Sequence, residues 1–194
     1  MKKNSFREGQ YMVIPENPVS MFLFNSVYSA WIWLALRLYL GYTWFTAGIK
    51  KLSSGTWTGE NAGAGLEGFV KGALAKAEGG DDVTGWYATF LENVVLPNSK
   101  VFAHMVAFGE TLVGLGLILG LLTGIAAFFG GLMNVSFLFA GSISVNPILF
   151  ILAILIVLAW KVAGWYGLDR WALPLLGTPW TRSSRETKEQ TTHI

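Results

Sequence analysis

The fold class follows from residues 101–160, which have the sequence VFAHMVAFGETLVGLGLILGLLTGIAAFFGGLMNVSFLFAGSISVNPILFILAILIVLAW. These 60 residues carry one formal charge, Glu110, where an average soluble domain would carry about 15. Only a much larger chain could bury so long an apolar stretch in a soluble core, and the remaining 134 residues are too few and too polar. The sequence therefore predicts a polytopic membrane protein.

The whole-chain composition excludes several classes of function. The 194 residues include 14 Lys or Arg and 12 Asp or Glu, and the small positive excess is spread along the chain, so nucleic-acid binding has no support. The absence of cysteine excludes disulfides, thiolate nucleophiles and iron–sulfur clusters, and two histidines are too few for two bis-His haems. We find no metal, haem or nucleotide motif.

Four apolar stretches are long enough to be transmembrane helices, since about 20 residues cross about 30 Å of hydrocarbon. The last three are joined by very short turns, which is typical of an up-down-up-down bundle. The expected fold is an all-α membrane protein, a four-transmembrane-helix bundle with a long, partly helical loop between the first and second spans. The predicted spans are residues 29–49, 101–122, 125–142 and 147–161, within a transmembrane domain of residues 29–162.

The other segments flank or interrupt this bundle. Residues 1–28 form a polar N-terminus and an interfacial lead-in, and residues 163–194 form an amphipathic C-terminal segment and a polar tail. The loop, residues 52–100, contains two predicted helices over 66–77 and 83–96. Aromatic residues on the second helix indicate that it lies on the membrane or over the bundle mouth; a solvated spacer is the alternative.

The basic residues beside the spans predict the orientation. Most of those close to helix ends lie on the side of the two termini, so we expect a multi-pass protein of the cell membrane with both termini cytoplasmic. Lys50 and Lys51, at the opposite end of the first span, argue for the reverse orientation.

Two ionisable residues lie well inside the predicted spans, where charges are costly and usually functional. Arg37 in the first span and Glu110 in the second have similar estimated depths, so a salt bridge between them is reasonable. Asn134, in the third span, falls at a similar depth. The pair has two interpretations: a structural ion pair inside the bundle, or part of a pocket for a polar headgroup, a proton or an anion.

Weaker candidates lie near the outer boundary. Lys50 and Lys51 would hold an anion or extend to the interface as ordinary lysines do. His104 would titrate near neutral pH or serve as a polar anchor. Asp169 is predicted to cap the N-terminus of the C-terminal segment.

Several of these residues belong to short motifs that follow one another along the chain: Arg37-x3-Gly41-x6-Gly48-x-Lys50, Gly109-Glu110-x3-Gly114-x5-Gly120, Asn134 and Gly167-Leu168-Asp169. Over about residues 31–171, this order resembles the DoxX/DoxD family of small four-helix membrane proteins. The loop, with Gly63-x-Gly65-Leu66-x-Gly68-Phe69 and Leu96-Pro97-Asn98, is most similar to DoxD-type members.

The resemblance implies a subunit of a quinone-linked oxidoreductase acting on thiosulfate or a related sulfur compound, with quinone as co-substrate and a small DoxA-like partner subunit. It places Arg37 and Glu110 in catalysis. Substrate would contact Asn134, Lys50, Lys51, His104 and Trp57. A homo-oligomer is also compatible with the family. The alternative is a non-enzymatic membrane scaffold or a small-solute or anion carrier, in which Arg37 and Glu110 form a structural or gating ion pair.

Overall fold

The computed structural model describes residues 16–80 and 83–177, and within these ranges it is helical, with no strand. The all-α prediction is therefore confirmed. The polar N-terminus up to residue 15 and the tail from residue 178 lie outside the described residues. The α-helices are α1 (Pro18–Asn25), α2 (Ala30–Leu52), α3 (Ala64–Glu78), α4 (Gly85–Phe90), α5 (Ser99–Leu119), α6 (Thr123–Phe139), α7 (Asn146–Leu158), α8 (Trp160–Ala163) and α9 (Asp169–Leu175).

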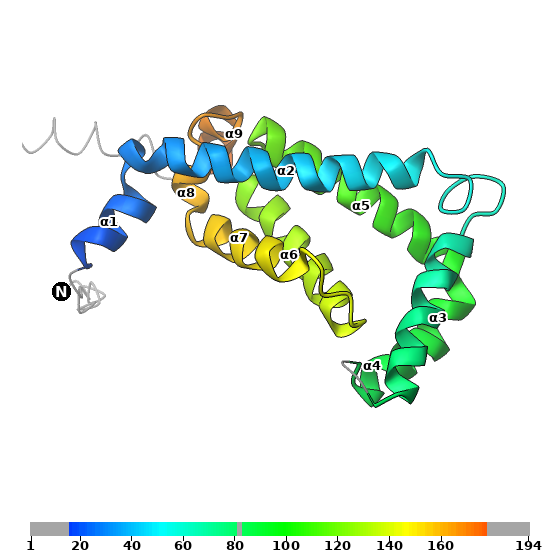
Figure 1. The fold of residues 1–194 in the computed structure, drawn as a ribbon. Coiled ribbons are helices and arrows are strands. Elements are labelled where there is room, and N and C mark those ends of the chain that lie inside the picture. The colour runs from blue at the N-terminus through cyan, green and yellow to red at the C-terminus, as the bar shows by residue number, and fades with distance from the viewer. Residues whose placement is uncertain (1–15, 81–82, 178–194) are drawn as a thin grey trace, which may run out of the picture.

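Two helix pairs form the main body of the molecule. Helix α2 packs lengthwise against α5, and α6 packs against α7 (Figure 1). Helix α5 also contacts α6 and α2 contacts α7, so these four helices enclose one core. The core contains buried apolar residues from all four of them, including Trp33, Leu40, Trp44, Leu117, Ala127 and Ile156.

Glycines set the register between α2 and α5. A Cβ atom on Gly48 would overlap the backbone of Thr111, and one on Gly114 would overlap the backbone of Phe45. Small residues let membrane helices approach until their backbones touch. In this antiparallel register, Glu110 on α5 lies opposite the C-terminal end of α2, and Arg37 lies opposite the turn that follows α5.

One helix is long and apolar enough to cross a membrane among the described residues. It runs without interruption from Gly85 to Leu119, 35 residues, and so includes α4 and α5. A second candidate is the pair Pro18–Asn25 and Val27–Leu52, which is bent by 68°. Helices α6 and α7 are apolar but shorter than 18 residues.

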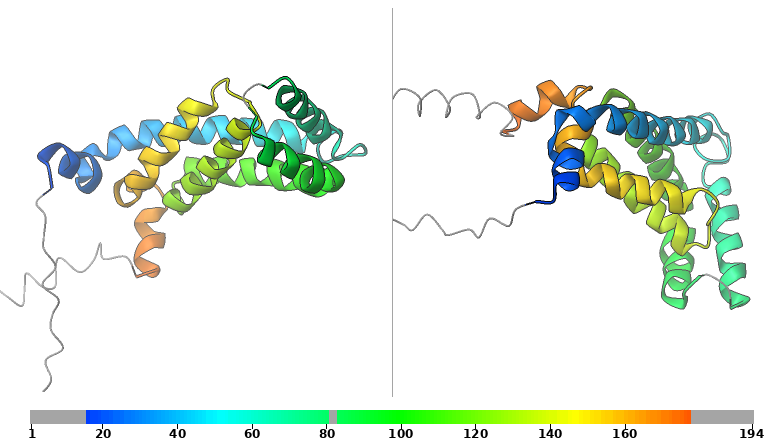
Figure 2. Two further views of the ribbon diagram at one scale, coloured as in Figure 1. Left: turned by 90° about the horizontal axis from the view of Figure 1, so that it is seen from below. Right: turned by 60° about the vertical axis from the view of Figure 1, so that its left-hand side comes forward.

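The loop between α2 and α5 folds into two antiparallel helical arms, which we call the cap (residues 54–98). Its second arm consists of α4, the π-helical turn η2 (Leu91–Val95) and the 3-10 turn η3 (Leu96–Asn98), and it continues directly into α5. The predicted helix 83–96 and the second predicted span are thus one helix. Figure 2 shows the two arms side by side at the end of the molecule remote from α1.

The cap is hydrogen-bonded to the C-terminal end of α6 and to the turn that follows it. The Lys76 Nζ donates a hydrogen bond of 2.6 Å to the carbonyl oxygen of Gly141, and the Tyr87 hydroxyl donates one of 2.8 Å to that of Ser136. Phe69 of α3 meets Phe137 of α6 edge to face, with ring centroids 5.9 Å apart. The cap therefore covers one end of the four-helix core, which is one of the two positions expected for it.

Candidate functional site

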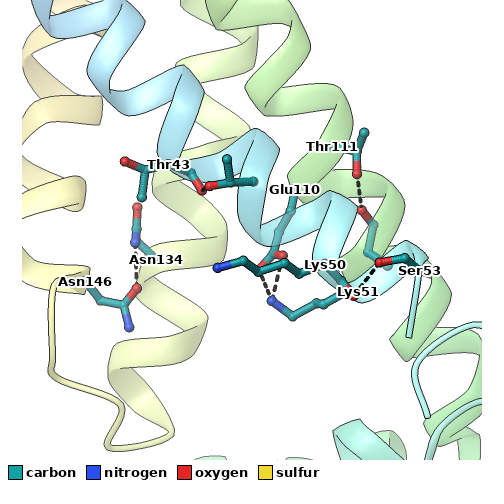
Figure 3. Close-up of polar contacts among 10 residues, drawn as sticks. Thr43, Lys50, Lys51, Ser53, Glu110, Thr111, Asn134 and Asn146 are labelled. Atoms are coloured by element: carbon teal, nitrogen blue, oxygen red, sulfur yellow. Dashed lines mark hydrogen bonds and ion pairs between the residues drawn. The ribbon is translucent and has the colours of Figure 1, made fainter. Parts of the chain in front are cut away.

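The buried carboxylate of the long apolar stretch pairs with a lysine at the end of α2. The Lys51 Nζ lies 2.8 Å from Glu110 Oε1 and 2.6 Å from Glu110 Oε2 (Figure 3). Glu110 is 1% exposed, whereas the Lys51 side chain keeps 22% of its surface accessible. The pair thus joins a buried acid to a cation that still reaches the surface.

The predicted ion pair between Arg37 and Glu110 is wrong. Arg37 is 14 residues before Lys51 on α2, a distance of about 21 Å along a helix axis. The prediction estimated the depth of each residue in the membrane from the boundaries of its own span, and this placed both residues at a similar depth. The glycine-determined register between α2 and α5 instead places Glu110 near the end of α2, where the long side chain of Lys51 reaches it.

Arg37 belongs to a second buried cluster at the opposite end of the core. Its Nη2 donates a hydrogen bond of 3.0 Å to the carbonyl oxygen of Tyr166, and the carboxylate of Asp169 is close enough to interact with its charge. A Cβ atom on Gly120 would overlap the Arg37 guanidinium, and Gly120 has a positive φ of 64°. Because the backbone of Gly120 fills the space beside the guanidinium, we interpret Arg37, Tyr166 and Asp169 as a structural cluster, which we call the clasp.

Asp169 caps a different helix from the one predicted. Its Oδ1 accepts a hydrogen bond of 2.6 Å from Leu122 N, and its Oδ2 accepts one of 2.9 Å from Thr123 N. Both donors stand at the N-terminus of α6, where backbone N–H groups lack helical partners. The C-terminal segment is therefore attached to the turn between α5 and α6.

A cavity of about 340 Å³ opens beside the Lys51–Glu110 pair. It lies at the cap end of the four-helix core, between α2, α5, α6 and α7. Trp44 from α2, Phe137 from α6 and Phe69 from the cap supply aromatic walls. The complete lining is Thr43, Trp44, Ala47, Lys51, Trp57, Phe69, Glu110, Phe137, Ser142, Val145, Asn146 and Leu149.

A second cavity of about 460 Å³ forms the mouth of the first. The two share four lining residues, Thr43, Ala47, Lys51 and Trp57, and the mouth adds Thr46, Lys50 and Ser54. The Lys51 Nζ also lies 5.0 Å from the centre of the Trp57 ring, in a cation–π contact. Lys50, Lys51 and Trp57 are thereby brought together with Glu110.

Two asparagines stand at the α6–α7 side of this site. Asn134 Nδ2 donates a hydrogen bond of 3.0 Å to Asn146 Oδ1, as Figure 3 shows. Asn146 lines the cavity, whereas Asn134 is fully buried behind it. Within the described residues, Asn134 Oδ1 has no hydrogen-bond partner. Asn134 therefore supports the site through Asn146.

His104 lies apart from the site. Its Nδ1 is 2.7 Å from the carbonyl oxygen of Lys100, and its ring stacks on Phe108 of the same helix. It lines neither the cavity nor its mouth. The described residues also contain no group of three or more His, Cys, Asp or Glu that could hold a metal ion.

Nine of the twelve residues that line the cavity were absent from the predicted site, among them Trp44, Phe69, Phe137 and Asn146. Of these four, Trp44 had a signal in the sequence, because it lies on the same helix face as Arg37 and Lys51, seven residues from each. The other three lie on elements that meet only after α6 and α7 fold back under the cap.

In comparison with known proteins, the family model described as DoxX matches residues 32–142, which cover most of α2 and all of the cap, α5 and α6. No curated protein and no solved structure matches the chain significantly.

Proposed function

Because this chain belongs to the DoxX family and is a membrane protein of that type, we propose that it is a four-span subunit of a quinone-linked oxidoreductase. The electron donor in this proposal is thiosulfate or a related sulfur anion, and a small DoxA-like subunit is the partner. The observation that carries the proposal is the aromatic cavity beside the buried Glu110 and its partner Lys51.

The proposed four spans are α2, α5, α6 and α7 together with α8, with both termini in the cytoplasm. The chain contains no cysteine, so single cysteines can report the topology without background. In intact cells, we expect a membrane-impermeant maleimide to label Glu78→Cys in the cap and to leave Thr192→Cys unlabelled until the cells are permeabilised. Labelling of both variants, or of Thr192→Cys alone, in intact cells would contradict this orientation.

The cavity suits the headgroup of a quinone. Ligand sites between helices are usually apolar pockets of about 300–1,000 Å³ with a few placed polar groups. Here Trp44, Phe69 and Phe137 offer flat apolar faces to a planar ring, and Lys51 is the ammonium donor that a ring carbonyl would accept from. Arg37 is too far along α2 to take part, so we now assign it to the clasp.

A bound quinone supplies an acceptor for two electrons and two protons. Glu110 and Lys51 are the groups in the cavity able to hold and pass a proton, because their atoms are in direct contact and Lys51 remains accessible from the mouth. Lys51 would orient the ring. Glu110, once protonated from the mouth through Lys51, would deliver one proton to the ring, and a second transfer by the same route would supply the second proton.

The mouth suits an oxyanion. Lys50 lines it, is exposed, and has no ion-pair partner among the described residues. Two thiosulfate ions joining as tetrathionate release two electrons, which matches the two that one quinone accepts. With no cysteine in the chain, no protein thiol can carry the electrons, so they pass directly between the two sites or through a partner subunit.

The test is thiosulfate-dependent reduction of a quinone by the purified protein in liposomes, with and without its partner. We expect Glu110→Gln and Lys51→Met to lower the rate at least about tenfold, because each removes a proton-transfer group from the site. Glu92→Gln and Lys71→Met make the same chemical changes at exposed positions of the cap and should keep the wild-type rate. Absorbance of the quinone measures the rate.

The same assay separates the enzyme from a carrier or scaffold. A redox-inactive wild-type protein that contains no extractable quinone would contradict the proposal and favour the non-enzymatic alternative. Wild-type rates in both Glu110→Gln and Lys51→Met, at normal protein levels, would remove the Lys51–Glu110 pair from the mechanism.

A further inference from the structure

Helix contacts close several sides of the cavity beside Lys51 and Glu110. Between α2 and α5, the backbones touch at Gly48 and Gly114 and leave no passage. Between α5 and α6, Gly130 brings α6 against Val113 and Trp44. These contacts seal the two walls that face α5.

The end of the cavity is closed by the cap. Phe69 and Trp57 lie over it, and the hydrogen bonds of Lys76 to Gly141 and of Tyr87 to Ser136 hold the cap against the α6–α7 turn. On the α6–α7 side, the Asn134–Asn146 hydrogen bond joins the two helices. The remaining side is the cleft between α2 and the N-terminal part of α7.

This cleft has residues of α2 on one edge and of the α7 start on the other. Thr43 and Ala47 line both the cavity and its mouth, and Val145 and Leu149 line the cavity opposite them. From Lys50 to Thr43 is seven residues, so the α2 edge extends about 10 Å along the helix axis. The cleft between α2 and α7 therefore lies on the flank of the bundle, and it adjoins the mouth, which Ser54 and Trp57 of the cap border at the capped end.

The chemistry of the cleft changes along its length. Lys50 and Ser54 make its cap end polar. Further along, the hydroxyls of Thr43 and Thr46 donate hydrogen bonds to the carbonyl oxygens of Tyr39 and Tyr42 in their own helix, at 2.9 and 2.8 Å. Because both hydroxyls are hydrogen-bonded within α2, the part of the cleft beside Thr43 and Thr46 can receive a hydrocarbon chain without leaving a polar group unpaired.

We propose that the cleft between α2 and α7 is a lateral entrance from the bilayer, through which a ligand with a long hydrocarbon chain inserts its polar ring beside Lys51 and Glu110. The chain of the ligand then lies between Thr43 and Val145 and continues into lipid. This inference rests on the proposed function for the identity of the ring, and it adds the route of entry and the position of the chain.

A second apolar groove is the competing route. It lies between α5 and α6, has a volume of about 660 Å³, and is lined by residues such as Met105, Leu112, Phe129 and Met133. It shares no lining residue with the cavity, and α5 separates it from the Lys51–Glu110 pair. A ring bound in the cavity therefore cannot extend its chain into this groove.

The experiment uses a quinone with a diazirine on its chain, close to the ring, and the full chain in liposomes. After irradiation, peptide mapping should place the label on residues 43–47 and 145–149, and an excess of chain-free quinone should suppress it. Ala47→Trp, which fills the cleft, should reduce this labelling about tenfold. Ile151→Trp adds a similar side chain at an exposed position of α7 that lines none of the cavities described above, and should leave the labelling unchanged.

The outcomes separate the entrance from the proposed function. Suppressible label on the α5–α6 groove or on the cap would overturn the entrance while leaving quinone binding intact. If chain-free quinone suppresses the label at no position, both the entrance and the proposed quinone binding are overturned. Suppressible label in the cleft of a protein that reduces no quinone would support the entrance and contradict the redox function.

Discussion

Replacing Asp169 with asparagine is expected to lower the free energy of unfolding by about 2–3 kcal/mol, because hydrogen bonds to a charged group contribute about 1.5–3 kcal/mol each and asparagine keeps one of the two acceptors. Asp169 and Arg37 are both at most 1% exposed. The substitution would leave the Arg37 charge without its carboxylate and would weaken the cap on Leu122 N and Thr123 N. The measurement is the midpoint of thermal or chemical unfolding of the purified protein in detergent.

A second substitution separates the charge from the cap. Arg37→Met in the Asp169→Asn background removes the unpaired cation, so it should recover part of the lost stability. Exposed Glu92→Gln serves as the control for loss of a carboxylate and should stay within about 0.5 kcal/mol of wild type. Equal stability of Asp169→Asn and Glu92→Gln would show that the clasp contributes nothing to the fold.

Substitution of Gly48 by alanine is expected to have a comparable effect at the other end of α2. The new Cβ would overlap the Thr111 backbone, which cannot rotate away as a side chain can. Overpacking costs about 1–3 kcal/mol in ordinary cores, and we expect the upper end here. The same shift would pull Lys51 away from Glu110, so quinone binding should fall together with stability.

Gly72→Ala provides the matched control. Gly72 lies within α3 and has open space around its Cα, so alanine there should raise stability slightly through its better helix propensity. Size-exclusion chromatography after heating measures the surviving folded fraction for both variants. Survival of Gly48→Ala equal to that of Gly72→Ala would contradict the close packing of α2 on α5.

The sequence predicted the helices better than it predicted their partners. Helices α2, α5, α6 and α7 overlap the four predicted spans, because apolar runs and Gly or Pro breaks are local signals. Pairing Glu110 with Arg37 failed because depth was measured along each helix separately. Contacts at Gly48 and Gly114 decide the register, and the positions of such contacts depend on which helix faces which.

Asp169 illustrates the same limit at a helix cap. Its place just before an amphipathic segment predicted a local N-cap, yet its carboxylate binds backbone donors 46 and 47 residues earlier in the chain. Phe69, Phe137 and Asn146 likewise join the cavity from three separate elements. Residues brought together by tertiary packing carry no local pattern that would identify them as one site.

The continuous helix from Gly85 to Leu119 has a mechanical consequence. A helix of 35 residues is about 50 Å long, whereas the hydrocarbon layer is about 30 Å thick. If α5, which carries Glu110, crosses the bilayer, the preceding part of the same helix, α4 with the turns η2 and η3, extends about 20 Å into the aqueous phase. A subunit that binds the cap from outside would act on the helix that holds the buried acid through the turns η2 and η3, which join α4 to α5 without a loop.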